Sequence, residues 1–181
     1  MEKITIKSAL LIAVALSALT ISVSAISAQG VKQNVKADTL TGYQETPSTL
    51  ASTGTGTFTA EIDEDAGIIT YELTYSGLSG AAAAAHIHFG GRFLSGGVSA
   101  FLCGGGSKPA CPAGTTDEAV VTGTIIAADI IGPTGQGISP GDIASLIQAI
   151  RAGVTYVNVH TPLHAGGEIR GQVNDEDQRQ P

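Results

Sequence analysis

Apolar and polar side chains alternate strictly near the C-terminal end of the chain, and this pattern constrains the fold more than any other. In residues 155–160 it places Val157 and Val159 on one side of an extended strand and polar side chains on the other. After a turn that contains Pro162, the alternation resumes in residues 169–173. The pattern predicts a β-hairpin with one apolar face, which a core must cover, and one polar face that carries the chemistry.

The rest of the chain is also typical of short strands joined by tight turns. It contains 24 glycines, and only 14% of its residues are charged and 4% aromatic, which favours strands and turns over helices. Residues 53–62 and 68–75 alternate on either side of an acidic turn and predict a second hairpin. We expect about seven to nine short strands in one domain, which predicts an all-β Greek-key sandwich or barrel.

One segment, residues 140–151, predicts a short helix with a structural role. Ser139 is a suitable N-cap, and Pro140 suits the first helical position. The apolar side chains of this segment recur at helical spacing: Ile143, Leu146, Ile147 and Ile150. We expect the helix to pack on the sheet edge or to close one end of the barrel.

Residues 1–28 are typical of a signal peptide. Lys3 and Lys7 precede an apolar run, and small residues end it. We expect cleavage after Ala28, or else after Ala25, with a retained membrane anchor as the alternative. The cleaved protein would be secreted, periplasmic or bound at the cell surface, and would not be attached to the membrane. At the other end, residues 174–181 are polar and predict a disordered tail.

The acidic charge of the chain limits its partners. The formal net charge is -7, and such a surface repels nucleic acids and anionic membranes. The sequence contains no Gly-x-Ser-x-Gly motif for a nucleophilic serine. These observations favour a binding protein over an enzyme and exclude nucleic acid as an expected partner.

Two cysteines, Cys103 and Cys111, flank a glycine-rich segment that can bend back on itself. In an exported protein this spacing predicts a disulfide that closes a short loop. Metal ligation by the cysteines is the weaker alternative, because their spacing matches no common zinc motif.

The four histidines of the chain occur as two pairs, His86 with His88 and His160 with His164. A His-x-His pair on a strand projects both imidazoles in the same direction, which suits chelation of one ion. The other pair can add ligands if the strands are neighbours. Imidazole ligands suit copper, zinc or nickel, and intrinsic affinity favours copper over zinc. The alternative is that the histidines are surface or hydrogen-bonding residues.

Three further polar residues share the histidine-bearing face of the C-terminal hairpin: Asn158, Glu168 and Arg170. They would lie around the metal ligands or face a bound anion. Glu168 and Arg170 project together, and an ion pair between them is a simpler interpretation than a catalytic acid.

Three stretches together make the chain resemble the chordin-type (CHRD) domain: Leu40–Pro47, Ala85–His88 and Tyr156–Gln172. The resemblance spans residues 37–173. It implies an extracellular all-β domain, which occurs alone in microbial secreted proteins and is repeated in chordin, an antagonist of bone morphogenetic proteins. It implies no established reaction, so the expected partner is an extracellular protein or a cell-surface ligand. The chain departs from the family in the single proline after Glu45 and in the cysteine loop.

A second resemblance is to the copper-zinc superoxide dismutases, which also carry a His-x-His strand on a Greek-key barrel. By that analogy His86, His88 and His160 resemble copper ligands, and Arg170 resembles an anion-steering residue. The chain lacks the bridging histidine and the zinc ligands in their usual segment. Two hypotheses follow: a non-enzymatic CHRD binding module that carries a metal site, and a copper-binding redox protein.

Overall fold

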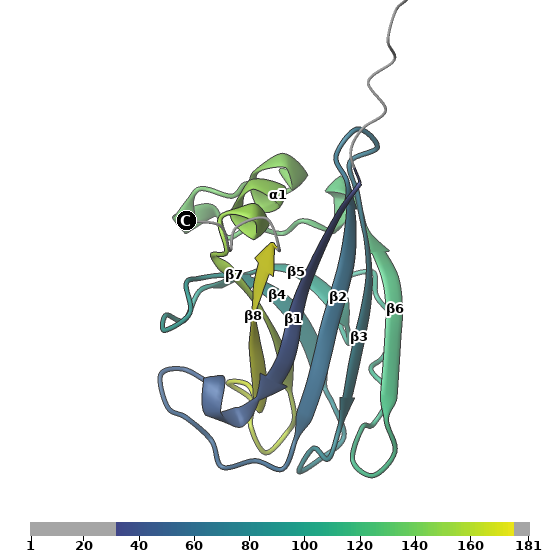
Figure 1. Ribbon diagram of the computed structural model, residues 1–181, viewed down its shortest axis with the longest axis vertical. Helices are drawn as coiled ribbons and strands as arrows, with labels where there is room; N and C mark the ends of the chain where they lie inside the picture. Colours follow the sequence, from purple (N-terminus) through teal and green to yellow (C-terminus); the bar gives the residue numbers. More distant parts are fainter. Residues whose placement is uncertain (1–31, 176–181) are drawn as a thin grey trace, which may run out of the picture.

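The computed structural model describes residues 32–175, which form eight antiparallel strands and one α-helix (Figure 1). The strands are β1 Gln33–Thr41, β2 Thr55–Asp63, β3 Ile68–Ser76, β4 Ala84–Phe89, β5 Gly97–Cys103, β6 Ala119–Ile125, β7 Thr155–His160 and β8 Ile169–Asp175. They form one sheet in the order β5-β4-β7-β8-β1-β2-β3-β6, curled into a nearly closed barrel. The expected all-β fold, a sandwich or a barrel, is confirmed, and the sheet takes the form of a barrel.

The strand order is not the chain order, and this brings distant segments together. β4 lies between β5 and β7, and β8 lies between β7 and β1. β5 and β6 are the two edges of the sheet. The hydroxyl of Tyr71 on β3 donates a buried hydrogen bond of 2.7 Å to the carbonyl of Leu102 on β5. This contact ties the two edge regions of the barrel together.

The core lies inside the barrel and follows the alternation of each strand. In the β2–β3 hairpin, Phe58 pairs with Leu73 and Ile62 with Ile69, and all four side chains are buried. In the β7–β8 hairpin, Val157 and Val159 face the same core. Burial of these side chains is the main favourable term in folding, about 1.5–3 kcal/mol for each large one.

The helix α1 (Ile143–Arg151) begins three residues later than the sequence pattern predicts. The N-cap is Asp142, whose carboxylate accepts hydrogen bonds from the backbone and hydroxyl of Ser145, at 3.0 and 2.6 Å. Ser139 and Pro140 instead belong to a turn closed by the bond from the Asp142 amide to the Ser139 carbonyl, 3.0 Å. The helix lies across the end of the barrel where β8 ends, as Figure 1 shows, and buries Leu146, Ile147 and Ile150 there.

The strands β4 and β7 are buried on both faces, which the sequence pattern did not predict. The histidines do project away from the barrel core, as expected. Their face is nevertheless covered by two loops, residues 42–54 and 90–96, which hydrogen-bond to side chains of β7 and β8. A covered polar face requires internal partners for its polar groups, so it is the natural place to look for a site.

Three remaining expectations concern the ends of the chain and the cysteines. The proposed signal peptide, residues 1–28, lies outside the described residues. β8 continues through Asp175, because residues 174 and 175 pair with β1, so it extends two residues into the segment expected to be a tail. Within residues 32–175, no helix is long and apolar enough to cross a membrane. The disulfide between Cys103 and Cys111 is present.

Candidate metal centre

Three histidines from two neighbouring strands meet on the outer face of the barrel. His86 and His88 project from β4, and His160 ends β7. The antiparallel register pairs His86 with Asn158 and Ala84 with His160, which sets His160 diagonally across from His86. One nitrogen from each ring lies within 4.8 Å of the other two. The pairing of β4 with β7 therefore gathers three of the four histidines into one cluster.

Backbone carbonyls orient two of these rings. The Nδ1 atom of His88 lies 3.0 Å from the Gly96 carbonyl, and that of His160 lies 3.0 Å from the Ala165 carbonyl. A carbonyl oxygen only accepts, so each Nδ1 carries the proton and each Nε2 is unprotonated and presents a lone pair. A neutral imidazole held in this way by its second nitrogen is the usual arrangement of a metal-ligating histidine.

Two buried imidazole nitrogens in the cluster have no protein partner. The Nε2 atoms of His86 and His88 are enclosed and make no hydrogen bond. Leaving a buried polar atom unsatisfied costs about 1–3 kcal/mol, so such atoms require an explanation. The Nδ1 atom of His86 lies 3.0 Å from the Nε2 atom of His160. Three rings that each bring a nitrogen within 4.8 Å of the others, two of them with an unpartnered Nε2 atom, fit a metal ion as the missing partner.

The electrostatics of the cluster keep the imidazoles neutral. Burial, together with the neighbouring His160 and His88, lowers the pKa of His86 to about 3. Burial likewise lowers the pKa of His88 to about 4, although its bond to Gly96 opposes this change. The pKa of His160 is also lowered by burial. Neutral imidazole is the form that binds a metal, so these groups are ready to ligate at neutral pH.

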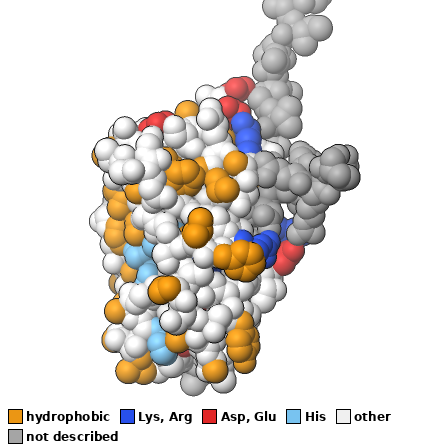
Figure 2. Space-filling view, turned by 90° about the vertical axis from the view of Figure 1, so that its left-hand side faces the viewer, with side chains coloured by type: hydrophobic (Ala, Val, Ile, Leu, Met, Phe, Trp, Pro, Cys, Tyr) orange, Lys and Arg blue, Asp and Glu red, His pale blue; other side chains and the backbone are white. Residues whose placement is uncertain are grey.

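Aromatic side chains enclose the triad. The ring of Tyr156 stacks on His88 with centroids 4.7 Å apart, and Phe101 meets His86 edge to face at 4.4 Å. His160 is partly exposed. Figure 2 shows histidine side chains at the surface beside hydrophobic ones on the face that it draws. The cluster is therefore held in an apolar surround that is open to solvent on one side.

Arg170 does not face an open anion site. Its side chain is 1% exposed, and its guanidinium lies 3.5 Å above the Tyr156 ring. It donates to the hydroxyl of Thr46 and to the carbonyls of Gly91, Arg92 and Leu94. These bonds clamp the loop 42–54 to the loop 90–96. Arg170 therefore has a structural role, because its guanidinium donates its hydrogen bonds to other groups of the protein.

Glu168 and Arg170 do not form the expected ion pair. The Glu168 carboxylate is fully buried and accepts four hydrogen bonds of 2.7 Å, two from Ser79 and one each from Ser52 and Thr161. Glu168 precedes β8 rather than alternating within it. These hydrogen bonds lower the pKa of Glu168 although burial opposes them. The carboxylate thus joins three loops, those that contain Ser52, Ser79 and Thr161.

His164 lies outside the triad. It belongs to the turn between β7 and β8, where its amide bonds to the Thr161 carbonyl at 3.1 Å. Asn158, the remaining candidate, is buried beneath the loop 42–54 and donates from Nδ2 to the Glu45 carboxylate at 2.5 Å. It supports this loop rather than the imidazoles.

Sequence reasoning missed Glu45, Tyr156 and Phe101 as parts of the site. Glu45 is buried beside Asn158, and burial raises its pKa to about 7, against the opposing charge of Arg170. Position 45 lies in the loop 42–54, which closes over the strands, and nothing in the local sequence pattern indicates its burial. The position of Tyr156 on the polar face of its strand was a usable signal. Phe101 joins the site only because β5 pairs with β4, which no local sequence pattern indicates.

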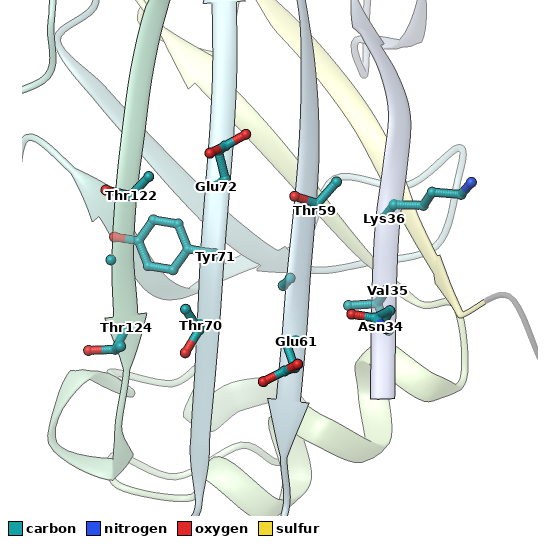
Figure 3. Close-up of a pocket in the computed structure, with 12 residues that line it drawn as sticks. Asn34, Val35, Lys36, Thr59, Glu61, Thr70, Tyr71, Glu72, Thr122 and Thr124 are labelled. Atoms are coloured by element: carbon teal, nitrogen blue, oxygen red, sulfur yellow. The ribbon is translucent and has the colours of Figure 1, made fainter. Parts of the chain in front are cut away.

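A separate groove of about 690 Å³ crosses the outer face of β1, β2, β3 and β6. Figure 3 shows two rows of side chains that border it. One row comprises Lys36, Thr59, Glu72 and Thr122, and the other comprises Asn34, Glu61, Thr70 and Thr124. The groove contains no histidine, so it is chemically distinct from the triad.

Comparison with known proteins adds one match. The family model described as CHRD domain matches residues 37–173, most of the chain. No curated protein and no solved structure gives a significant match.

Proposed function

The chain belongs to the CHRD domain family, and we propose that it is an extracellular, non-catalytic binding module that holds a copper ion. The ligands are His86, His88 and His160. The observation that carries this proposal is the convergence of their ring nitrogens within 4.8 Å, with two buried Nε2 atoms that have no partner. The family supports a binding module, and the triad supports the metal.

Copper is preferred to zinc for a physical reason. Neutral imidazoles bind both ions, but the intrinsic affinity of nitrogen ligands is higher for Cu²⁺ than for Zn²⁺. Three imidazoles leave at least one further coordination position, which water or a residue of a partner would occupy. The triad therefore suits a copper ion that remains accessible from the partly exposed side of His160.

The extracellular location is supported by two observations. The Cys103–Cys111 disulfide suits an oxidising compartment, and CHRD domains are extracellular modules. The proposed partner is an extracellular protein or a cell-surface ligand, because the acidic chain repels nucleic acids.

The decisive experiment measures the metal content and Cu²⁺ affinity of purified protein. We expect one Cu²⁺ per chain, with loss of binding in the His86→Ala, His88→Ala double variant. His164→Ala is the matched control, because this histidine lies outside the triad, and it should bind like the wild type. Substoichiometric copper in the wild type, or retention of copper by the double variant, would disprove the site.

A redox function is the second candidate, favoured by the coordination position that three protein ligands leave open. Copper-loaded protein would then accelerate superoxide dismutation, and the double variant would not. The burial of Arg170 weighs against this function, since its guanidinium is bound within the protein. Activity equal to that of the double variant would leave the non-catalytic function in place.

A further inference from the structure

Phe101 connects the metal centre to the cysteine loop, residues 104–110. On β5 it pairs with His86 of β4, and the two rings meet edge to face with centroids 4.4 Å apart. The Phe101 ring also lies directly against Gly105. A Cβ atom at Gly105 would fall 2.2 Å from the nearest ring atom, so only glycine fits there without displacing the ring. One aromatic side chain thus contacts both a metal ligand and the loop.

The disulfide joins the two ends of this loop. Cys103 is the last residue of β5, two positions after Phe101, and its bond returns the chain at Cys111 to the same strand. Between them the loop is fastened by Lys108, which lies 2.8 Å from the Asp129 carboxylate. Ser107 donates to the same carboxylate at 2.7 Å. The amides of Gly104 and Lys108 also donate to the carbonyls of Pro109 and Gly105, at 2.7 and 3.1 Å. Loss of the disulfide would release the end of the loop at Cys111 from β5, while these bonds still hold its middle.

We propose that the Cys103–Cys111 disulfide is a redox-sensitive support of the metal centre, acting through Phe101 on His86. The inference rests on the proposed metal-binding function. With the disulfide intact, the loop holds the Phe101 ring against the imidazole and limits its orientations. With the disulfide reduced, Phe101 and His86 gain freedom, and the preorganised ligand set is weakened.

The reductant is a dithiol. One of its thiolates attacks a sulfur of the disulfide, the bond between Cys103 and Cys111 breaks, and a mixed disulfide forms. The second dithiol sulfur resolves that intermediate. Two electrons and two protons pass to the protein, which then carries two thiols, and the dithiol leaves as a cyclic disulfide.

The test uses variants, because free thiols themselves bind metals. Cys103→Ala, Cys111→Ala removes the disulfide, and Gly105→Ala displaces Phe101 with the disulfide intact. Gly135→Ala is the matched control, since a Cβ there meets nothing within 4 Å. We expect the Kd for Cu²⁺ to rise about tenfold in the first two proteins, the size typical for loss of support around a ligand, and to be unchanged in the control.

Metal-free protein provides an independent readout. Nitrogen NMR signals of the His86 ring should shift or broaden in both test variants and on dithiol reduction of the wild type, while those of His164 stay fixed. If Cu²⁺ affinity stays within twofold of wild type and the His86 signals do not move, the redox support is disproved while the metal site stands. If the oxidised wild type binds no Cu²⁺, the proposed function fails. The His86 signals still test whether the disulfide acts on His86 through Phe101.

Discussion

The Nδ1 atom of His86 lies 3.0 Å from the Nε2 atom of His160, and only one proton fits between them. Because His160 already donates its Nδ1 proton to the Ala165 carbonyl, its Nε2 atom can only accept. The proton between the two rings therefore belongs to His86 in the metal-free protein. A metal ion on the His160 Nε2 atom would replace this hydrogen bond, and the neutral His86 ring would still carry its one proton.

The first prediction concerns the pH dependence of metal binding. The pKa of His86 is lowered to about 3 and that of His88 to about 4, so both imidazoles are neutral well below their ordinary pKa of 6.5. Cu²⁺ affinity should therefore be constant between about pH 5.5 and 7.5, because binding displaces no proton from the ligands. Calorimetric titration in several buffers measures both the Kd and the protons released. Weakening by about tenfold per pH unit below 6.5 would contradict this expectation.

Glu45 should make stability fall as the pH rises. Its pKa in the folded protein is about 7, above the ordinary 4.5, because burial disfavours the charged form. The stability that the protonated carboxyl contributes is fully present below pH 4.5 and is lost as the pH rises through 7. The difference between the folded and the ordinary pKa corresponds to about 3 kcal/mol in the free energy of unfolding.

Glu45→Gln isolates this effect, because the amide cannot ionise. Urea unfolding at pH 5, 6, 7 and 8 should show the wild type losing stability relative to the variant with increasing pH. A constant difference between the two proteins across this range would rule out a titrating Glu45.

Glu168→Gln should be strongly destabilising. The buried carboxylate accepts hydrogen bonds from Ser52, Ser79 and Thr161, and an amide cannot accept all of them. We expect a loss of about 3 kcal/mol or more in the free energy of unfolding, measured in urea at pH 7. Because the folded pKa is lowered, this contribution is present above the ordinary pKa of 4.5 and is lost as the pH falls through the folded value.

The exposed Glu72 on the outer face of β3 supplies the control for Glu168. Glu72→Gln should change stability by less than about 0.5 kcal/mol. Equal effects of the two substitutions would show that the Glu168 hydrogen bonds contribute little.

Arg170→Lys should loosen the loops 42–54 and 90–96. An ammonium lacks the planar fork that reaches Thr46 and the carbonyls of Gly91 and Leu94 together. Amide hydrogen exchange in both loops should accelerate at least tenfold, while exchange in β2 and β3 stays slow. Arg151→Lys is the control, since that side chain is half-buried and its ion pair with Glu64 lies at the surface. Unchanged protection of both loops would contradict the clamp.

Much of the fold and part of the site could be predicted from local patterns. Alternation in residues 155–160 and 169–173 determined which side chains of the hairpin enter the core, because side chains on a strand point to opposite faces in turn. The spacing of Cys103 and Cys111 determined a short loop that a disulfide can close. The His86-x-His88 pair determined two imidazoles on one face.

Only the tertiary structure decided what those faces meet. The pairing of β4 with β7 chose His160 over His164 as the third imidazole, and no local pattern encodes a contact between residues 74 positions apart. Loop closure over the polar face buried Arg170 and separated it from Glu168, because the carbonyls and hydroxyls of covered loops supply partners that an isolated hairpin lacks. Which side chains share a face follows from the two-residue period of a β-strand. Their partners follow from long-range packing, which the whole chain determines together.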